Sequence, residues 1–360
     1  MFTQSGGANP NIPEPQWYLD ISKYERPDLW KSIFQLVSSL GFYAVMWAIL
    51  IWMVNQACSW WLLLPVATIA AAFLVRIFII FHDCIHNSFF ISRRANRFWG
   101  YVTGLFTFTP FEEWQYSHNM HHNTYADLDS RGVGDIWTLT ADEYIKSPFR
   151  IKLGYRLYRN PFVMFGMGPA YIFLINYRFS EKGSGSKRRF SVLFNNLVIL
   201  FFIGMLVILK IPLIYFLLYI YVLVAGATCG VWLFYVQHQF EGVYWSRHNE
   251  WNPLKAAFEG SSYYKLPKIL QWFSGNIGLH PIHHIRSRIP NYNLQRCYDK
   301  TPALHAIKKL SLLKSIKSLR LNLWDEQEKK LVSFHALKAY RANAQYFQAI
   351  SVREKTLKRQ

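Results

Sequence analysis

Four long apolar runs, each free of acidic residues, divide the chain. Residues 34–55 form the first run, and residues 60–81 form the second, which is interrupted only by Arg76. A helix rises about 1.5 Å per residue, so each run is long enough to cross the hydrocarbon core of a bilayer. The short connection between them predicts a tight antiparallel hairpin. Residues 191–209 and 212–237 repeat the pattern, with Lys210 and Pro212 at the turn.

Two shorter apolar runs do not fit a regular span. Residues 98–111 are too few to cross a bilayer, and residues 162–179 are interrupted by Gly166, Gly168 and Pro169. We interpret both as interfacial or re-entrant segments. The alternative, a full span at 162–179, would reverse the membrane side of everything that follows it.

Charge orients these runs. The chain carries a formal net charge of +19 although 52% of its residues are hydrophobic. Outside Arg76 and Lys210, the Lys and Arg residues lie in three blocks: residues 1–33, 82–190 and 238–360. The positive-inside rule predicts that these blocks, and so both termini, are cytoplasmic. Nucleic-acid binding is disfavoured because the basic stretches flank apolar spans and match no nucleic-acid-binding motif.

The pattern therefore predicts an all-α integral membrane protein with four spans in two hairpins and a cytoplasmic helical cap. Its parts are an N-terminal cytoplasmic segment (1–33), a first hairpin (34–81), a middle block (82–190), a second hairpin (191–237) and a C-terminal block (238–360). Residues 180–189 (SEKGSGSKRR) look like a basic linker into the third span. Residues 302–340 mix apolar and basic positions at helical spacing, which predicts amphipathic helices on the membrane surface or over the cap.

Three short clusters hold eight of the twelve histidines. They are His82 and His86; His118, His121 and His122; and His280, His283 and His284. Spacings of three and four residues place side chains on one face of a helix, so each cluster can direct its imidazoles at one point. The four-span topology puts all three clusters on the cytoplasmic side. A full span at residues 162–179 would separate the second cluster from the third.

Neutral imidazole is a common metal ligand, and eight nitrogen ligands suit two metal ions better than one. A zinc hydrolase usually has three ligands and a nearby Glu base, and no HExxH motif occurs here. Redox iron fits better, and a site at the edge of the apolar spans suggests a lipid or hydrocarbon substrate. His238, at the end of the fourth span, is either a ninth ligand or an interfacial histidine. His248, His305 and His335 have no partners at ligand spacing and are taken as ordinary polar residues.

Other polar residues near the clusters have open roles. When one ring nitrogen of an imidazole binds a metal ion, the other carries a proton and needs a hydrogen-bond acceptor. Six acidic residues lie near the clusters in sequence, and any of them could be such an acceptor: Asp83, Asp129, Asp135, Glu112, Glu113 and Glu241. Arg76 either extends to the cytoplasmic interface, which we favour, or pairs near the site. The four cysteines, Cys58, Cys84, Cys229 and Cys297, have no spacing typical of disulfide frameworks or iron–sulfur clusters.

At these residues the chain resembles the integral-membrane fatty acid desaturases, which carry histidine boxes in the order HxxxH, HxxHH, HxxHH. The stretches HDCIHNSFF, RGVGDIWTLT, FYVQHQFE and HPIHHIRSRIPNYNL are similar to bacterial acyl-lipid and omega-6-type desaturases. The boxes alone are shared with alkane hydroxylases of the same superfamily. A di-iron hydroxylase is therefore the nearest alternative, and a membrane metal transporter or sensor is a distant one.

The resemblance implies a di-iron enzyme that uses dioxygen and two electrons to insert a cis double bond into a fatty acyl chain. It implies iron ligation by the eight box histidines and assigns His238 as a ninth. In the animal acyl-CoA branch an Asn lies four residues before that histidine, and here the position is Phe234. No HPGG motif of a fused cytochrome b5 occurs, so a separate donor such as ferredoxin or flavodoxin is expected. The basic cytoplasmic face would attract an acidic donor.

Overall fold

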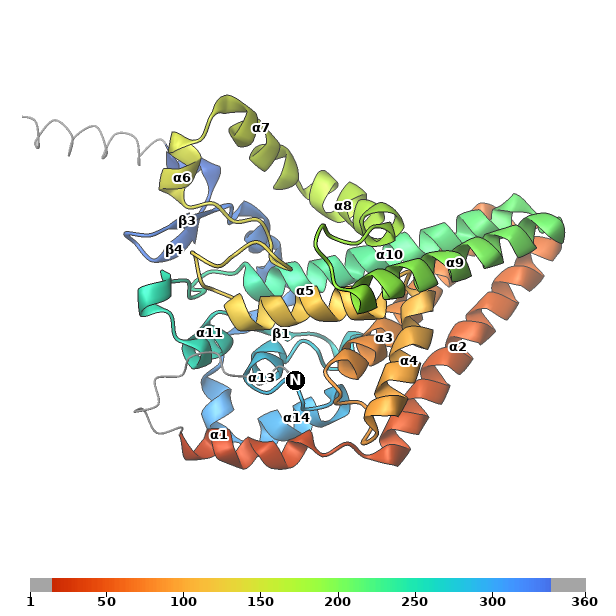
Figure 1. The fold of residues 1–360 in the computed structure, drawn as a ribbon, viewed down its shortest axis with the longest axis horizontal. Coiled ribbons are helices and arrows are strands. Elements are labelled where there is room, and N and C mark those ends of the chain that lie inside the picture. Colours follow the sequence, from red (N-terminus) through yellow and green to blue (C-terminus); the bar gives the residue numbers. More distant parts are fainter. Residues whose placement is uncertain (1–14, 338–360) are drawn as a thin grey trace, which may run out of the picture.

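The computed structural model describes residues 15–337, which form a mostly helical protein (Figure 1). Four helices are long and apolar enough to cross a membrane: α2 (Leu29–Asn55), α3 (Trp60–Ile85), α9 (Ser186–Ile208) and α10 (Leu213–His238). They coincide with the four apolar runs, but all except α10 begin or end several residues beyond the run. His82 and His238 therefore lie on the last turns of α3 and α10.

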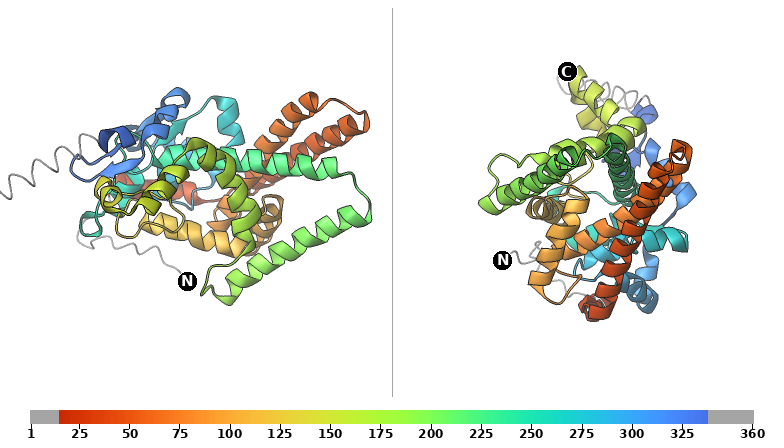
Figure 2. Two further views of the ribbon diagram at one scale, coloured as in Figure 1. Left: turned by 90° about the horizontal axis from the view of Figure 1, so that it is seen from above. Right: turned by 90° about the vertical axis from the view of Figure 1, so that its right-hand side faces the viewer.

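Helix α3 is the centre of the helical bundle. Helices α2, α4 (Arg93–Phe106) and α10 all pack against it, and 61% of its most apolar window is buried, against 17% for α9. Helix α9 packs mainly on α5 (Phe111–Thr124) and diverges from α10 along its length (Figure 2). The structure therefore packs α3 and α10 against each other, and both helices carry histidines at their ends.

The two segments expected at the interface differ from each other. The first is mostly the regular helix α4, which packs on α3. The second is wound from short pieces: the π-helices Val163–Met167 and Tyr171–Ile175, with α8 (Gly168–Ala170) between them and a 3-10 turn at Asn176–Arg178. Helices α6 (Ala141–Lys146) and α7 (Phe149–Tyr158) precede it. Isolated π-turns often occur at functional sites, and this segment forms one wall of the cavity described below.

The C-terminal block corrects two predictions. Residues 302–337 do not form amphipathic helices but a series of short elements, and two two-stranded sheets make the fold mostly rather than purely helical. Strand β1 (Tyr263–Lys265) pairs in parallel with β2 (Lys309–Ser311), and β3 (Leu323–Asp325) pairs antiparallel with β4 (Lys330–Val332). The remaining elements are η5 (His248–Glu250), η6 (Pro302–Ala306), α15 (Leu312–Ser315), η7 (Ile316–Arg320) and η8 (Phe334–Ala336). Residues 338–340 of the predicted helical stretch lie outside the described residues.

The N-terminal elements cover the third histidine cluster. Ile21 and Tyr24 of the turn Ile21–Glu25, which follows α1 (Gln16–Asp20), are buried with Ile282 and Ile285 of α13 (His280–Ile285) in one apolar cluster. Helix α14 (Asn291–Lys300) packs beside them, and α11 (Pro253–Glu259) packs on α13 from another side. This layer buries the helix that carries three box histidines.

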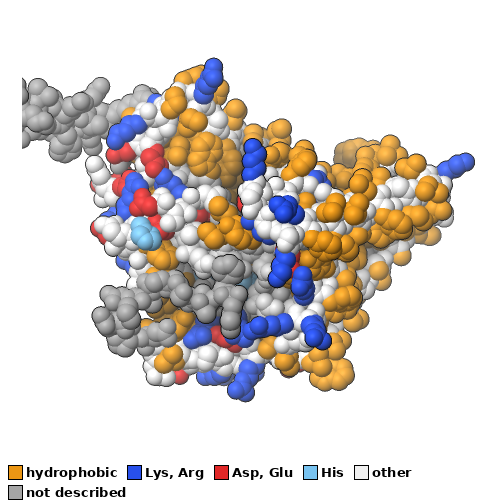
Figure 3. All heavy atoms as spheres, viewed as in Figure 1, with side chains coloured by type: hydrophobic (Ala, Val, Ile, Leu, Met, Phe, Trp, Pro, Cys, Tyr) orange, Lys and Arg blue, Asp and Glu red, His pale blue; other side chains and the backbone are white. Residues whose placement is uncertain are grey.

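The Arg76 side chain, which we expect to extend to the cytoplasmic interface, is buried against the C-terminal block. The side chain is 7% exposed; the guanidinium donates to the Trp272 carbonyl and lies 3.9 Å from the centre of that residue's ring. Trp272 belongs to α12 (Lys268–Phe273), which packs on α3. The charge therefore joins a span to the C-terminal block. On the surface, apolar side chains dominate the end of the molecule formed by the long helices, and charged side chains gather on the rest (Figure 3).

Candidate metal centre

Four helices bring the nine predicted histidines together. The second cluster lies on α5 and the third on α13, while His82 lies in the last turn of α3, His86 caps that helix, and His238 ends α10. Eight of the nine form two groups in which all candidate ligand atoms lie within 4.8 Å of one another. The first group is His82, His86, His118 and His283, and the second is His121, His238, His280 and His284.

His122 lies between the two groups. Its Nε2 is 2.9 Å from Nε2 of His283 and 3.1 Å from Nε2 of His118, both in the first group. Its ring centre is 4.3 Å from that of His284 in the second group. All nine predicted residues therefore meet at one place, although they come from distant parts of the chain.

The spacing of the ring nitrogens fits metal ions. Nε2 atoms of His82 and His118 are 3.1 Å apart, and those of His238 and His280 are 2.9 Å apart. Two nitrogens at right angles, each about 2.1 Å from one metal ion, are separated by about 3.0 Å. In addition, Nε2 of His86 is buried with no hydrogen-bond partner among the described residues. A cation at each group would satisfy nitrogens that otherwise face one another.

The surroundings keep six of the nine imidazoles neutral. Burial, followed by the nearby imidazoles, lowers the pKa well below the ordinary histidine value for six histidines outside the spans: His86, His118, His122, His280, His283 and His284. A neutral ring keeps a lone pair available for a metal ion at physiological pH. The site is thus prepared for cation binding.

Two of the six candidate acids contact box histidines. Asp135 Oδ1 lies 2.5 Å from Nδ1 of His121, and Asp83 Oδ1 lies 3.2 Å from Nδ1 of His82. Since a carboxylate only accepts, each ring donates from Nδ1 and presents the Nε2 lone pair to its group. The Asp83 carboxylate is itself held, because Asn291 donates to its Oδ2 from backbone N and from Nδ2 at 2.7 and 2.8 Å.

The other four acids have different partners or face solvent. Asp129 pairs with Arg247, Glu112 with Arg97 and Glu113 with Arg188. Glu241 is exposed. These residues therefore do not orient a box histidine directly.

A glycine turn delivers Asp135 to the site. Gly134 has φ +77°, and a Cβ there would lie 2.6 Å from the Ser117 carbonyl oxygen of α5. Only glycine combines this backbone conformation with such a close approach. The turn thus brings the residue after it against His121.

Three aromatic rings that pack on the histidines complete the centre. Trp114 stacks on His118 at 4.4 Å between ring centres, and Tyr125 lies 4.3 Å from His238. Phe234 contacts both His121 and His238, at 5.0 and 4.8 Å. Sequence reasoning noted Phe234 but missed the other two. Trp114 precedes His118 by one helical turn, a spacing that predicts their contact.

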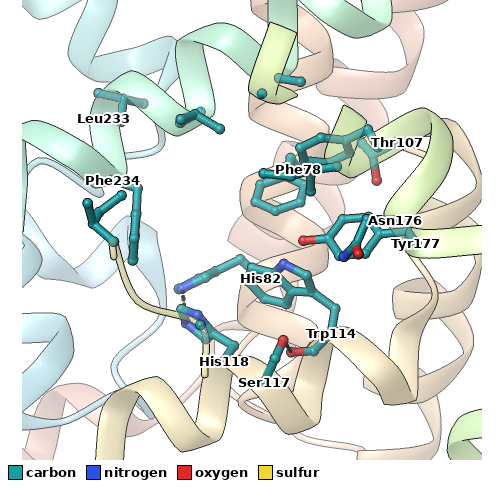
Figure 4. Close-up of a pocket in the computed structure, with 18 of the residues that line it drawn as sticks. Phe78, His82, Thr107, Trp114, Ser117, His118, Asn176, Tyr177, Leu233 and Phe234 are labelled. Atoms are coloured by element: carbon teal, nitrogen blue, oxygen red, sulfur yellow. Dashed lines mark hydrogen bonds between the residues drawn. The ribbon is translucent and has the colours of Figure 1, made fainter. Parts of the chain in front are cut away.

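An apolar cavity of about 650 Å³ opens beside the histidines. Its lining includes His82 and His118 of the first group and His280 of the second. Figure 4 shows Phe78, Trp114 and Phe234 around it, with the two first-group histidines at one end. Its volume is in the range of ligand pockets, and its walls come from α3, α5, α10 and the π-helical segment.

The three histidines set aside from the sequence lie elsewhere. His248 is near the surface and pairs with Asp127, and His305 lies 3.0 Å from the Tyr298 carbonyl oxygen. His335 is exposed. Neither candidate metal group includes any of them.

The chain is similar to known proteins over most of its length. The family model described as fatty acid desaturase matches residues 59–309. A fatty acid desaturase of Bacillus subtilis is 42% identical over 318 residues, covering 88% of this chain and 90% of the relative. An sn-1 oleoyl-lipid 12-desaturase of Picosynechococcus is 28% identical, covering 66% and 69%. An sn-1 acyl-lipid omega-3 desaturase (ferredoxin) of Nostoc is 24% identical, covering 83% and 82%.

The matched region contains every histidine of both groups and three of the four candidate spans in full or nearly so. The relative from Bacillus subtilis is similar across nine-tenths of its own length, so the likeness is not confined to the histidine boxes. This chain belongs to the fatty acid desaturase family, and it is a membrane oxidoreductase that desaturates fatty acyl chains.

Proposed function

We propose that the protein uses two iron ions, dioxygen and two external electrons to insert a cis double bond into an acyl chain carried by a membrane lipid. The observation that carries the proposal is the cavity wall, to which both histidine groups contribute. An acyl chain in this cavity would pass directly beside His82, His118 and His280.

The nine histidines would hold the irons. The first group with His122 would hold one ion, and the second group would hold the other. Bound iron would supply the reduction of dioxygen and the capacity to remove hydrogen from an unactivated C–H bond, which no protein side chain provides. The overall reaction balances when –CH2–CH2–, O2, two electrons and two protons give –CH=CH– and two water molecules.

The chain's own residues would position the substrate and exclude water. Phe78, Trp114 and Phe234 confine the acyl chain to a narrow apolar path beside the histidines. Asp83 and Asp135 keep the Nδ1 protons of His82 and His121 in place, so that both rings present the correct nitrogen. Enclosure by apolar walls limits unproductive reaction with water.

A lipid-borne substrate agrees with the cavity and with the relatives. The cavity lies beside helices long enough to span a bilayer, and the cyanobacterial relatives are named for acyl-lipid substrates. We further propose that the four helices form two hairpins with the histidines and termini on the cytoplasmic side, because the positive-inside rule favours that side for the basic blocks. Electrons would come from a separate carrier such as ferredoxin or flavodoxin; one relative carries ferredoxin in its name.

The experiment is expression in a host that lacks unsaturated fatty acids, with double-bond positions mapped in the extracted lipids. We expect alkenes in chains attached to lipids and two irons per purified chain. Alcohols without alkenes would favour the related hydroxylase reaction instead. Two zinc ions in an active preparation would overturn the redox assignment.

A further inference from the structure

One end of the cavity reaches the surface at the beginning of α9. Phe179, Ser180 and Glu181 line the cavity, and Phe179 is 70% exposed. Gly132 and Val133 of the turn before Asp135 also line it and are exposed. These residues form the mouth through which a chain would enter.

Basic residues follow the mouth immediately. Lys182, Lys187 and Arg189 are exposed and form no ion pair with any residue in the described part of the chain. Arg188 is partly buried between them. We call Lys182, Lys187, Arg188 and Arg189 the cationic lip. Its only acidic neighbour in sequence is Glu181.

Arg188 is fixed over the mouth rather than extended into solvent. Its Nε and Nη2 donate to both carboxylate oxygens of Glu113 at 2.8 and 2.6 Å, and Nη2 also donates to Glu181 at 2.7 Å. The guanidinium lies 3.8 Å from the centre of the Tyr116 ring. Glu113 and Glu181 both line the cavity, so Arg188 joins two residues of its wall. No hydrogen bond within residues 15–337 uses Nη1, which leaves that nitrogen available for an anion.

The lip lies at the foot of a candidate span. Helix α9 begins at Ser186, directly after the linker, and Phe190 on its first turns is 59% exposed. Lys and Arg residues that directly precede an apolar span are typical of the boundary between the apolar core and the headgroups. Figure 3 shows Lys and Arg side chains at the boundary between the apolar surface of the long helices and the more polar remainder. A bilayer around the candidate spans would therefore bring lipid phosphates close to this mouth.

We propose that the cationic lip binds the phosphate of a membrane phospholipid whose acyl chain lies in the cavity. The inference rests on the proposed function, because it assumes that the cavity holds the acyl substrate. The apolar cavity accepts the chain, and the cations at its mouth hold the headgroup, which fixes how far the chain enters. A lipid without phosphate would lack this contact. Soluble acyl thioesters carry phosphate too, so the test must separate the two sources.

The test compares two lipids that differ in the headgroup alone. Purified protein with its electron donor is reconstituted into nanodiscs that contain phosphatidylglycerol or a diglucosyl diacylglycerol with identical acyl chains. A triple variant, Lys182→Gln/Lys187→Gln/Arg189→Gln, removes the unpaired cations. The control, Lys255→Gln/Lys329→Gln/Lys330→Gln, removes the same charge from surface sites away from the mouth.

We expect wild type and control to desaturate the phospholipid at least about fivefold faster than the glycolipid. The triple variant should lose this preference and desaturate the glycolipid at the same rate as the charge-matched control. If the triple variant still prefers the phospholipid over the glycolipid, the proposal is overturned. The same holds if its desaturation rate falls equally on both lipids. Desaturation of added acyl-CoA, but of neither bilayer lipid, would overturn the assignment to a membrane lipid.

A binding measurement that needs no turnover separates this proposal from the proposed function. Native mass spectrometry of protein from mixed micelles counts the phosphatidylglycerol and glycolipid molecules that are retained. Wild type and control should retain phosphatidylglycerol selectively, and the triple variant should not. Equal retention of phosphatidylglycerol by all three proteins would refute phosphate binding by the cationic lip, even if desaturation is observed. Selective retention without any desaturation would support the lip and count against the proposed reaction.

Discussion

Asp135, which directly follows the turn at Gly134, accepts a hydrogen bond from Nδ1 of His121 at 2.5 Å. This hydrogen bond joins the loop to a histidine on α5. Asp135→Asn should weaken iron binding about 10- to 100-fold, because the amide no longer fixes the ring tautomer with a charge. Metal titration of the purified protein measures this effect. Asp129→Asn is the control, because Asp129 pairs with Arg247 at the surface. Equal iron affinity in both variants would show that Asp135 does not orient His121.

Asn291 supports His82 indirectly, through Asp83. It donates twice to Asp83, which in turn contacts His82, and its Oδ1 accepts from Gln35 at 3.0 Å. Asn291→Ala leaves buried polar groups unpaired and should lower the free energy of unfolding by about 1–3 kcal/mol. Thermal unfolding in detergent, with iron content measured in parallel, checks this. Asn249→Ala, an exposed change, should leave both quantities as in wild type.

The cavity offers a direct way to block the acyl path. Gly230 lines it, and a Cβ built there meets no atom within 4 Å, so a leucine at this position would extend into the cavity without straining the helix. Gly230→Leu should fold normally and lose most activity on long chains. Gly204→Leu on α9 has equally open space but lies outside the cavity and should stay active. Full activity on long chains in the Gly230 variant would mean that the substrate takes another path.

Phe234 lies between the cavity and two histidines of the second group, His121 and His238. Its ring contacts His121 and His238 and also lines the cavity wall. Phe234→Ala should admit water beside the site, so that oxygen consumption exceeds double-bond formation severalfold. The ratio of oxygen consumed to double bonds formed is the measurement, with Phe190→Ala on exposed α9 as the control. An unchanged ratio would remove Phe234 from the water barrier.

The lowered pKa values predict how the metal-free protein responds to acid. Burial holds the pKa of His118, His122 and His283 below the unfolded value of about 6.5. Below that pH the unfolded chain binds protons that the folded chain does not, so folding stability falls as pH decreases. Denaturation of the metal-free protein between pH 8 and pH 5 should show progressive loss of stability below about pH 6.5. Stability that is flat or rises toward acid would contradict neutral, buried histidines.

The sequence predicted which histidines gather in one place better than it predicted the residues around them. Hydrophobic run length located the four long helices, and helical spacing located eight histidines, because both signals are local. The choice of Asp135 over Asp129 was not predictable, since it depends on a turn at Gly134 that folds against α5. The family resemblance, rather than spacing, assigned His238.

In the C-terminal block, the sequence pattern predicted the wrong secondary structure. Its apolar and basic positions suggested helices, but Tyr263 pairs with Lys309 across many residues and draws that segment into a strand. Likewise, the Trp272 carbonyl that receives Arg76 is far away in sequence. Pairings of this kind depend on tertiary contacts, which local periodicity does not encode.

The order in which the ligands appear along the chain has a consequence for biogenesis. His82 and His86 emerge early during synthesis, whereas His280, His283 and His284 follow only after the last candidate span. Neither metal group is complete until α13 has docked beside α5 and the ends of α3 and α10. The proposed iron ions would therefore be retained tightly only by chains that have finished inserting and folding. Metal loading would act as a late checkpoint, and chains cut off before α13 should remain iron-free.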